Sequence, residues 1–146
     1  MPKIKKYLFH DLTKRELEEL VLLYNRIRQE TSTWLDKEEV TIESFSDQVE
    51  VETIYIAYKD ENMIGFLTFY VPDNFIHLFF VDATIQGSGI GSKLLTEIFS
   101  DFDGEEISLK CLIHNQSAIS FYEHKGFNII ETHDLGKNEG YHLMKK

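Results

Sequence analysis

The sequence has little cysteine, little positive charge and no long apolar segment. Cys111 is the one cysteine among 146 residues, so no disulfide can form within the chain, and such a chain fits a reducing compartment. The net charge of −10 argues against a basic surface for nucleic acid. Apolar runs fall well short of the roughly 20 residues of a membrane span, and the run behind the basic start is too brief for a signal peptide. We therefore expect a cytoplasmic protein that binds neither nucleic acid nor membrane.

The composition is ample for a packed core, since 42% of the residues are hydrophobic and 13% are aromatic. A length near the typical 150 residues, without repeat or linker, predicts one domain over residues 1–146. Hydrophobic spacing predicts helices over residues 14–30 and 42–49, and the first follows a capping box at Thr13 and Glu16. Alternating β-branched and aromatic residues predict a hairpin over 53–71 and a further strand over 75–82. The second half reads strand, helix, strand, helix and terminal hairpin, which indicates one α/β domain.

A glycine-rich segment, Gln-Gly-Ser-Gly-Ile-Gly-Ser-Lys at 86–93, stands between a predicted strand and a predicted helix. Free backbone N–H groups and the positive end of the helix dipole would attract a phosphate there. It is not a P-loop, because Leu94 follows Lys93 where a serine or threonine is required. It is not a dinucleotide fingerprint either, because Ser92 stands where the third glycine belongs. A plain turn without a ligand also accounts for this segment when it is taken alone.

A second motif, Asn-Gln-Ser-Ala-Ile-Ser-Phe-Tyr-Glu-His-Lys-Gly-Phe, occupies residues 115–127. Asn115 is suited to cap a helix and Gly126 to end it, while Tyr122 alone would more often be a packing aromatic. In this order and on these elements, the two motifs resemble the GCN5-related N-acetyltransferase (GNAT) superfamily. The matching residues are Gln86, Gly89 and Gly91 in the first motif, and Asn115, Ala118, Phe121, Tyr122, Gly126 and Phe127 in the second.

The resemblance implies a mixed sheet of six to seven strands with about four helices, in which the fourth and fifth strands splay apart. Acetyl-CoA, as acetyl donor, would lie between those strands, and Tyr122 would protonate the leaving thiolate. Asn115 would bond the pantetheine arm, and Lys125 would lie near phosphate. The family's backbone contacts carry over to Phe79, Phe80 and Val81 along the pantetheine, and to Gln86, Gly87, Ser88, Gly89, Ile90, Gly91 and Ser92 around the pyrophosphate.

The general base remains open at this stage. His77 is a candidate because strict alternation along its strand gives it the same face as Phe79 and Val81; Asp82 and a water molecule are the others. An exposed strand histidine without a catalytic role accounts for His77 as well. In this family the amine attacks the thioester directly, and Cys111, mid-strand among apolar neighbours, is better explained as a structural residue than as a nucleophile. Histidine spacing gives no metal-ligand pattern, so we expect no metal.

Acceptor residues should come from the loop between the first two helices and from the terminal hairpin. Trp34 is a candidate pocket wall, although a core position explains it equally, and Tyr141 and Asn138 are weaker candidates. Residues 30–61 hold ten acids and two bases, which favours a cationic acceptor or a solvated acidic face. We expect an N-acetyltransferase acting on a small-molecule amine, such as an amino acid or polyamine. A protein N-acetyltransferase and a non-catalytic acyl-CoA-binding domain are the alternatives, and a homodimer is left open.

Overall fold

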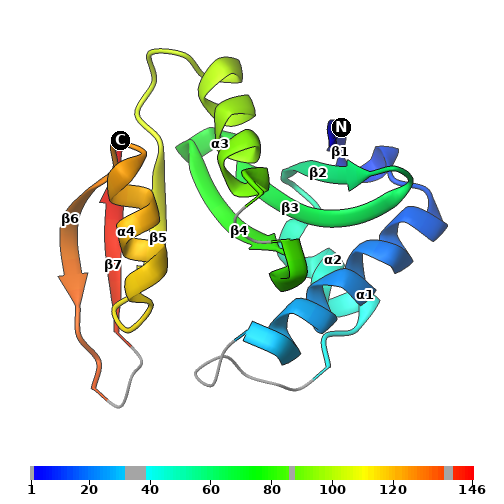
Figure 1. The fold of residues 1–146 in the computed structure, drawn as a ribbon, viewed down its shortest axis with the longest axis horizontal. Helices are drawn as coiled ribbons and strands as arrows, with labels where there is room; N and C mark the ends of the chain where they lie inside the picture. The colour runs from blue at the N-terminus through cyan, green and yellow to red at the C-terminus, as the bar shows by residue number, and fades with distance from the viewer. Residues whose placement is uncertain (1, 32–38, 86–87, 137–139) are drawn as a thin grey trace.

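The protein is described by a computed structural model that covers residues 2–31, 39–85, 88–136 and 140–146. These residues form four α-helices and a seven-stranded mixed sheet, which confirms the expected α/β class (Figure 1). In chain order the elements are β1 (Lys3–Leu8), α1 (Lys14–Thr31), α2 (Ile42–Val49), β2 (Thr53–Lys59), β3 (Asn62–Tyr70), β4 (Phe75–Val81), α3 (Ile90–Asp101), β5 (Ser108–Leu112), α4 (Gln116–His124), β6 (Asn128–His133) and β7 (Tyr141–Lys145).

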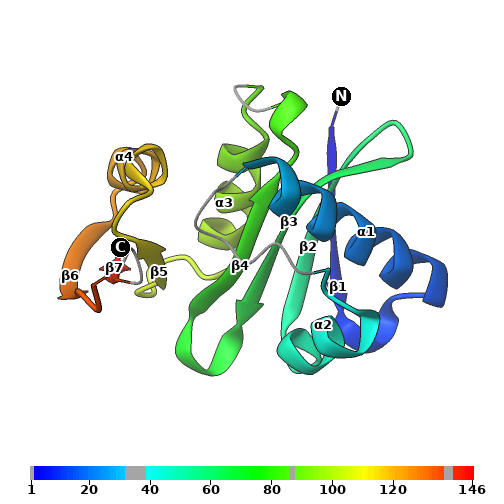
Figure 2. The ribbon, with the colours of Figure 1, turned by 90° about the horizontal axis from the view of Figure 1, so that it is seen from below.

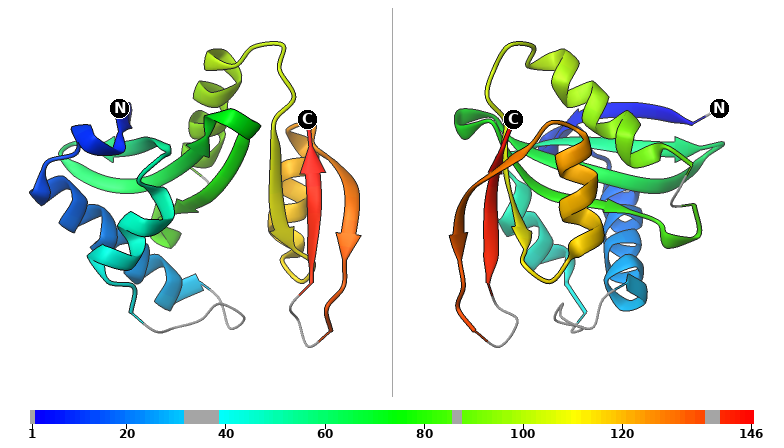
Figure 3. Two further views of the ribbon diagram at one scale, coloured as in Figure 1. Left: turned by 180° about the vertical axis from the view of Figure 1, so that it is seen from behind. Right: turned by 60° about the vertical axis from the view of Figure 1, so that its left-hand side comes forward.

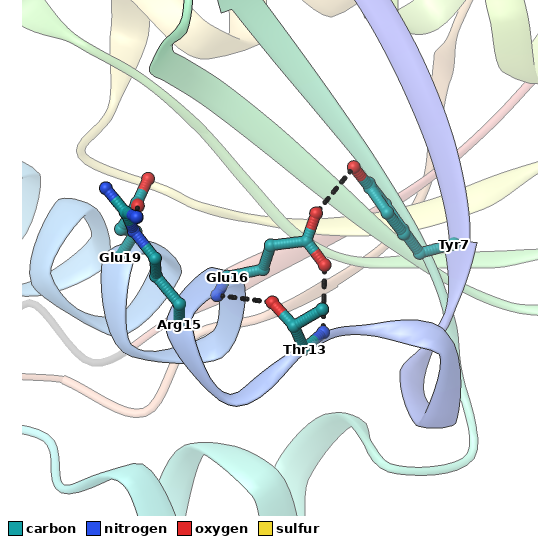
Figure 4. A network of polar contacts seen from close by, with 5 residues as sticks. All are labelled: Tyr7, Thr13, Arg15, Glu16 and Glu19. Carbon is teal, nitrogen blue, oxygen red and sulfur yellow. Dashed lines mark hydrogen bonds and ion pairs between the residues drawn. The ribbon is translucent and has the colours of Figure 1, made fainter.

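Helix α1 begins with the capping box that the sequence predicts. The Glu16 backbone N–H donates to Thr13 Oγ1 at 3.1 Å, and the Thr13 N–H donates back to Glu16 Oε1 at 2.8 Å (Figure 4). The Tyr7 hydroxyl donates to the second carboxylate oxygen of Glu16 at 3.2 Å. Two backbone donors at the helix start are therefore satisfied, and the same carboxylate ties α1 to β1.

A side-chain clamp joins α1 to the chain that enters α2. The buried Asn25 amide donates to the Val40 carbonyl at 2.8 Å, and its oxygen accepts from the Val40 N–H at 2.7 Å. Thr41 then caps the start of α2, because its hydroxyl accepts from the Ser44 N–H. This clamp holds the chain that enters α2 against α1.

The sheet has the order β1-β2-β3-β4-β5-β7-β6, and β4 and β5 are its parallel neighbours. These two strands pair only where Phe75 faces Ser108 and Ile76 faces Leu109. Beyond Ile76 they diverge, so β5, β7, β6 and α4 stand apart from the first four strands (Figure 2). This divergence confirms the splayed fourth and fifth strands. We call β5 to β7 with α4 the terminal lobe.

Two apolar cores lie on opposite faces of the sheet. One joins α1 and α2 to β2, β3 and β4 through residues such as Leu20, Phe45 and Phe66. The other joins α3 and α4 to the opposite side of the same strands and to the terminal lobe, through Leu94, Ile98 and Ile119 among others. In the left view of Figure 3 the strands of the terminal lobe are seen from the face that α4 leaves uncovered. The opening between β4 and β5 starts beyond Ile76 and lies beside this second core.

Candidate active site

Aromatic rings from both sides of the splay meet at the opening between β4 and β5. The Phe79 ring of β4 lies 6.2 Å from the Tyr122 ring and 6.2 Å from the Phe121 ring, measured between centroids. Tyr122 also packs edge-on against Phe127 at 5.7 Å. Because Phe79 belongs to β4 and the other rings to the terminal lobe, aromatic packing continues where strand pairing ends.

The chain enters α3 beside these rings. Gly89 caps the helix at φ +86°, a conformation that disfavours any side chain, and no side-chain hydrogen bond caps the described residues of this turn. A Cβ built on Gly91 would lie 3.4 Å from the Phe121 ring, so the turn packs closely on α4. The first N–H groups of α3 remain available to an anion, which is the geometry of a phosphate site.

Tyr122 is half-buried among aromatic rings, and its hydroxyl makes no hydrogen bond within the described part of the chain. Burial raises its pKa well above the ordinary value, and the nearby Cys111 thiol raises it further. The hydroxyl therefore stays protonated at neutral and mildly alkaline pH. It thus carries the proton that a general acid needs, whereas it would be a poor base.

Cys111 lies on β5, and only 6% of its surface is exposed. Burial raises the pKa of its thiol to about 11, so little thiolate exists near pH 7. Its Sγ contacts the Leu112 carbonyl at 3.7 Å, and no base activates it within the described residues. The structure therefore supports a structural role for Cys111.

Asn115 and Lys125 stand at the two ends of α4. Asn115 caps the helix, accepting from the Ala118 N–H at 3.2 Å, as the sequence predicts. Lys125 lies about 15 Å away along the helix at a rise of 1.5 Å per residue, with its amine 5.6 Å from the centre of the Phe121 ring that packs beside Gly91. The Lys125 amine thus lies on the side of α4 that faces Gly91. The roles assigned to Asn115 and Lys125 in binding CoA remain predictions.

His77 does not share a face with Phe79 and Val81, so the face predicted from strand alternation is wrong. A β-bulge shifts the β3–β4 register, because Thr68 faces Leu78 while its neighbour Phe69 faces Ile76. Ile76, Phe79 and Val81 consequently pack into the core of α3 and α4. The His77 Nδ1 contacts Glu52 Oε2 at 2.7 Å, and Glu52 leads from α2 into β2.

Asp82, the other candidate base, is held by three donors. Its Oδ1 accepts from the Thr84 N–H at 2.9 Å and hydroxyl at 2.8 Å, and its Oδ2 accepts from Arg26 Nη1 at 2.6 Å. Burial pulls its pKa upward, but the Thr84 and Arg26 donors outweigh this and leave the pKa of Asp82 below its usual range. Asp82 is thus a poor proton acceptor, and it ties α1 to the chain between β4 and α3.

We predict that Asp82→Ala lowers the free energy of unfolding by about 2–3 kcal/mol, because it leaves the Thr84 donors and the Arg26 cation without their acceptor. Urea unfolding followed by circular dichroism measures the change. Since the pKa of Asp82 is depressed in the fold, its contribution is present above pH 4 and is lost as the pH falls through the lowered value. A variant of unchanged stability at pH 7 that has lost activity would assign Asp82 to the chemistry instead.

Several sequence-based candidates lie outside the described residues, namely Trp34, Gln86, Gly87 and Asn138. Glu52, conversely, was not a candidate, because an isolated acid before a strand carries no motif. His77 lies at the bulge of β4, and there its ring contacts the Glu52 carboxylate. Among the described residues no cluster of three or more metal-ligating side chains occurs. No described helix has the length and apolar character needed to cross a bilayer.

Comparison with known proteins agrees with this geometry. The sequence model of the acetyltransferase (GNAT) family matches residues 15–127. A search of curated proteins by sequence finds no match.

Solved structures share the fold over nearly the whole chain. A GNAT-family acetyltransferase from Streptococcus pneumoniae aligns with a TM-score of 0.76 at 22% identity, covering 100% of this chain and 99% of that one. The PaiA N-acetyltransferase from Thermoplasma acidophilum, solved with coenzyme A, gives 0.76 at 21% identity, covering 100% and 98%. The ribosomal-protein-S18-alanine N-acetyltransferase from Escherichia coli gives 0.73 at 20% identity, covering 99% and 92%.

Proposed function

The chain belongs to the acetyltransferase (GNAT) family, and we propose that it transfers an acetyl group from acetyl-CoA to a primary amine of a small molecule, of amino acid or polyamine type. The observation that carries the proposal is the opening between β4 and β5. It combines an uncapped helix start, the edge of β4 that β5 leaves unpaired and the hydroxyl of the half-buried Tyr122.

The described residues fit acetyl-CoA at this opening. The first N–H groups of α3 would hold the pyrophosphate, with Lys125 nearby. The backbone of Phe79 and its neighbours on β4 would pair with the pantetheine arm, because β5 does not pair with β4 beyond Ile76. Acetyl-CoA supplies the thioester carbon that the amine attacks. A β4 backbone N–H would stabilise the developing oxyanion, a contribution of about 3–4 kcal/mol, and the Tyr122 hydroxyl would protonate the thiolate.

The acceptor must lose a proton to react. A lysine-like amine with a pKa near 10.4 is neutral in only about one molecule in 2,500 at pH 7, which costs about 4.6 kcal/mol, whereas an α-amine near 7.8 costs about 1 kcal/mol. A base is therefore important for the first class and nearly dispensable for the second. We assign that role to His77, because Asp82 is already engaged by three donors.

A cationic small molecule also agrees with the charge on α2. Glu43, Asp47 and Glu50 are exposed and follow one another at helical spacing, so they form one acidic face. Two residues later the chain reaches Glu52, the partner of His77. An approaching ammonium group would meet a favourable field along this route.

The test is the release of free CoA thiol from acetyl-CoA across a panel of amines. We expect turnover that depends on a polyamine or an amino acid and saturates with it. The panel includes peptides with free N-termini, because a protein acceptor would favour those over the small amines. A protein that binds CoA, yet gives no amine-dependent turnover with any acceptor, would be a binding domain, and the proposed activity would be wrong.

A further inference from the structure

The buried carboxylate of Glu52 contacts the ring of His77. Glu52 is 7% exposed, and its Oε2 lies 2.7 Å from His77 Nδ1. An ionised carboxylate can only accept a hydrogen bond, so the proton of this contact belongs to Nδ1. About a third of the His77 side chain is exposed (34%), and no described residue bonds its Nε2. In the neutral imidazole, the nitrogen without a proton is then Nε2.

The contact with His77 matters because the Glu52 carboxylate has no other hydrogen-bond partner among the described residues. Its Oε1 is buried without any hydrogen-bond partner in the described part of the chain. A buried carboxylate that lacks partners is unfavourable, so the His77 N–H is the contact that compensates its burial. A proton gained at Nε2 would make the imidazole cationic and would add Coulomb attraction to the same carboxylate.

The position of the pair links it to the opening. Ile76 makes the last β4–β5 pair, and His77 follows it at the bulge, where the strands begin to diverge. Glu52 lies between the end of α2 at Val49 and the start of β2 at Thr53, close in the chain to the acidic face of that helix. The pair thus connects the start of the splay with the chain that follows the acidic face of α2.

We propose that Glu52 is a positioning residue that holds His77 with its proton on Nδ1, so that Nε2 accepts the proton of the attacking amine. As the amine nitrogen bonds to the acetyl carbon and the C–S bond breaks, the amine proton moves to Nε2 and the thiolate takes the Tyr122 proton. The carboxylate then stabilises the imidazolium. This inference rests on the proposed acetyl transfer for its catalytic part, whereas the tautomer of His77 is a property of the free protein.

The kinetic test is a double-mutant cycle on Glu52→Gln and His77→Ala, with the best amine of the panel. The carboxamide keeps the shape of Glu52 but can donate an N–H to Nδ1, which moves the ring proton to Nε2. We expect each single variant to lower kcat about 100-fold and the double variant to be within about twofold of the His77→Ala variant. A further full loss from Glu52→Gln in the His77→Ala background would show a structural role and overturn the proposal.

The second readout does not need activity. Long-range ¹H–¹⁵N spectra of histidine-labelled protein report which ring nitrogen carries the proton. We expect His77 in the free wild type to be protonated at Nδ1, and in Glu52→Gln to be protonated at Nε2. Wild-type protein with the proton at Nε2 would overturn the inference, even if the enzyme is active. Conversely, wild type without amine-dependent turnover would remove the proposed acetyl transfer and leave the tautomer result standing.

Asp101→Asn is the matched control. Asp101 is a carboxylate of α3 that accepts from the Tyr55 hydroxyl at 2.7 Å and from the Lys6 amine at 3.1 Å, away from the opening. We expect this variant to lose stability, with kcat within about twofold of wild type and the His77 spectrum unchanged. A loss of kcat equal to that of Glu52→Gln would mean that carboxylate removal acts through general destabilisation, and would overturn the proposal.

Discussion

Tyr122→Phe is expected to lower kcat about 100-fold while the dissociation constant for CoA changes little. The change removes one hydroxyl and keeps the ring that packs against Phe79 and Phe127, so the opening should retain its shape. The pKa of Tyr122 is raised by burial and by Cys111, so the hydroxyl that the substitution removes is protonated at neutral and mildly alkaline pH. Without it, CoA must leave as an unprotonated thiolate.

Steady-state turnover and calorimetric titration with CoA measure the two effects separately. Tyr58→Phe is the matched control, because it removes a hydroxyl that bonds Tyr7 Oη at 2.9 Å on the opposite side of the sheet layer. Because the pKa of Tyr122 lies above its ordinary value near 10, wild-type activity should not fall between pH 8 and 10 through ionisation of this residue. Unchanged kcat at saturating substrates in the Tyr122→Phe variant would remove the tyrosine as the acid.

Ser92→Glu is expected to weaken CoA binding at least about tenfold, through one added negative charge in the first turn of α3. The same charge interacts favourably with the helix dipole, so the free protein should be as stable as wild type or slightly more stable. The two effects have opposite signs, which separates loss of the anion site from loss of the fold. Gly89→Glu would be a poorer test, because the φ of +86° at Gly89 adds backbone strain to the charge.

Thr96→Glu places the same charge one turn further along α3, where the side chain is exposed. Calorimetric titration with CoA should give a dissociation constant within about threefold of wild type for this control. Equal weakening by both variants would indicate a general charge effect of the acidic protein rather than a phosphate site at the helix start.

Local signals in the sequence predicted most of the fold. The capping box at Thr13, the helix cap at Asn115 and the hairpin of β2 and β3 each depend on residues close together in the chain, and the structure confirms them. The splay was implied by the family motifs. The face of His77 was mispredicted because strict alternation fails at a bulge, and nothing in the local sequence marks this one.

The remaining parts of the site depend on distant contacts. Glu52 and His77 stand 25 residues apart, and Arg26 and Asp82 stand 56 apart, so no spacing rule relates them. Asp82 illustrates the difficulty. From its place at the end of a strand it is a candidate general base, but the hydrogen-bond donors that bind its carboxylate are known only from the structure. Burial and bonding decide which acid takes up a proton, and both follow from the tertiary packing.

The place of β7 in the sheet has a consequence for synthesis on the ribosome. β7 is made after β6 but lies between β5 and β6, and it supplies the neighbour of both. Until residues 141–145 have emerged, β6 has no partner and β5 has only its two pairs with β4. The strands before β5 can pair as they appear, whereas the terminal lobe must wait. Tyr122, which lies on that lobe, is therefore among the last side chains to reach its place beside Phe79.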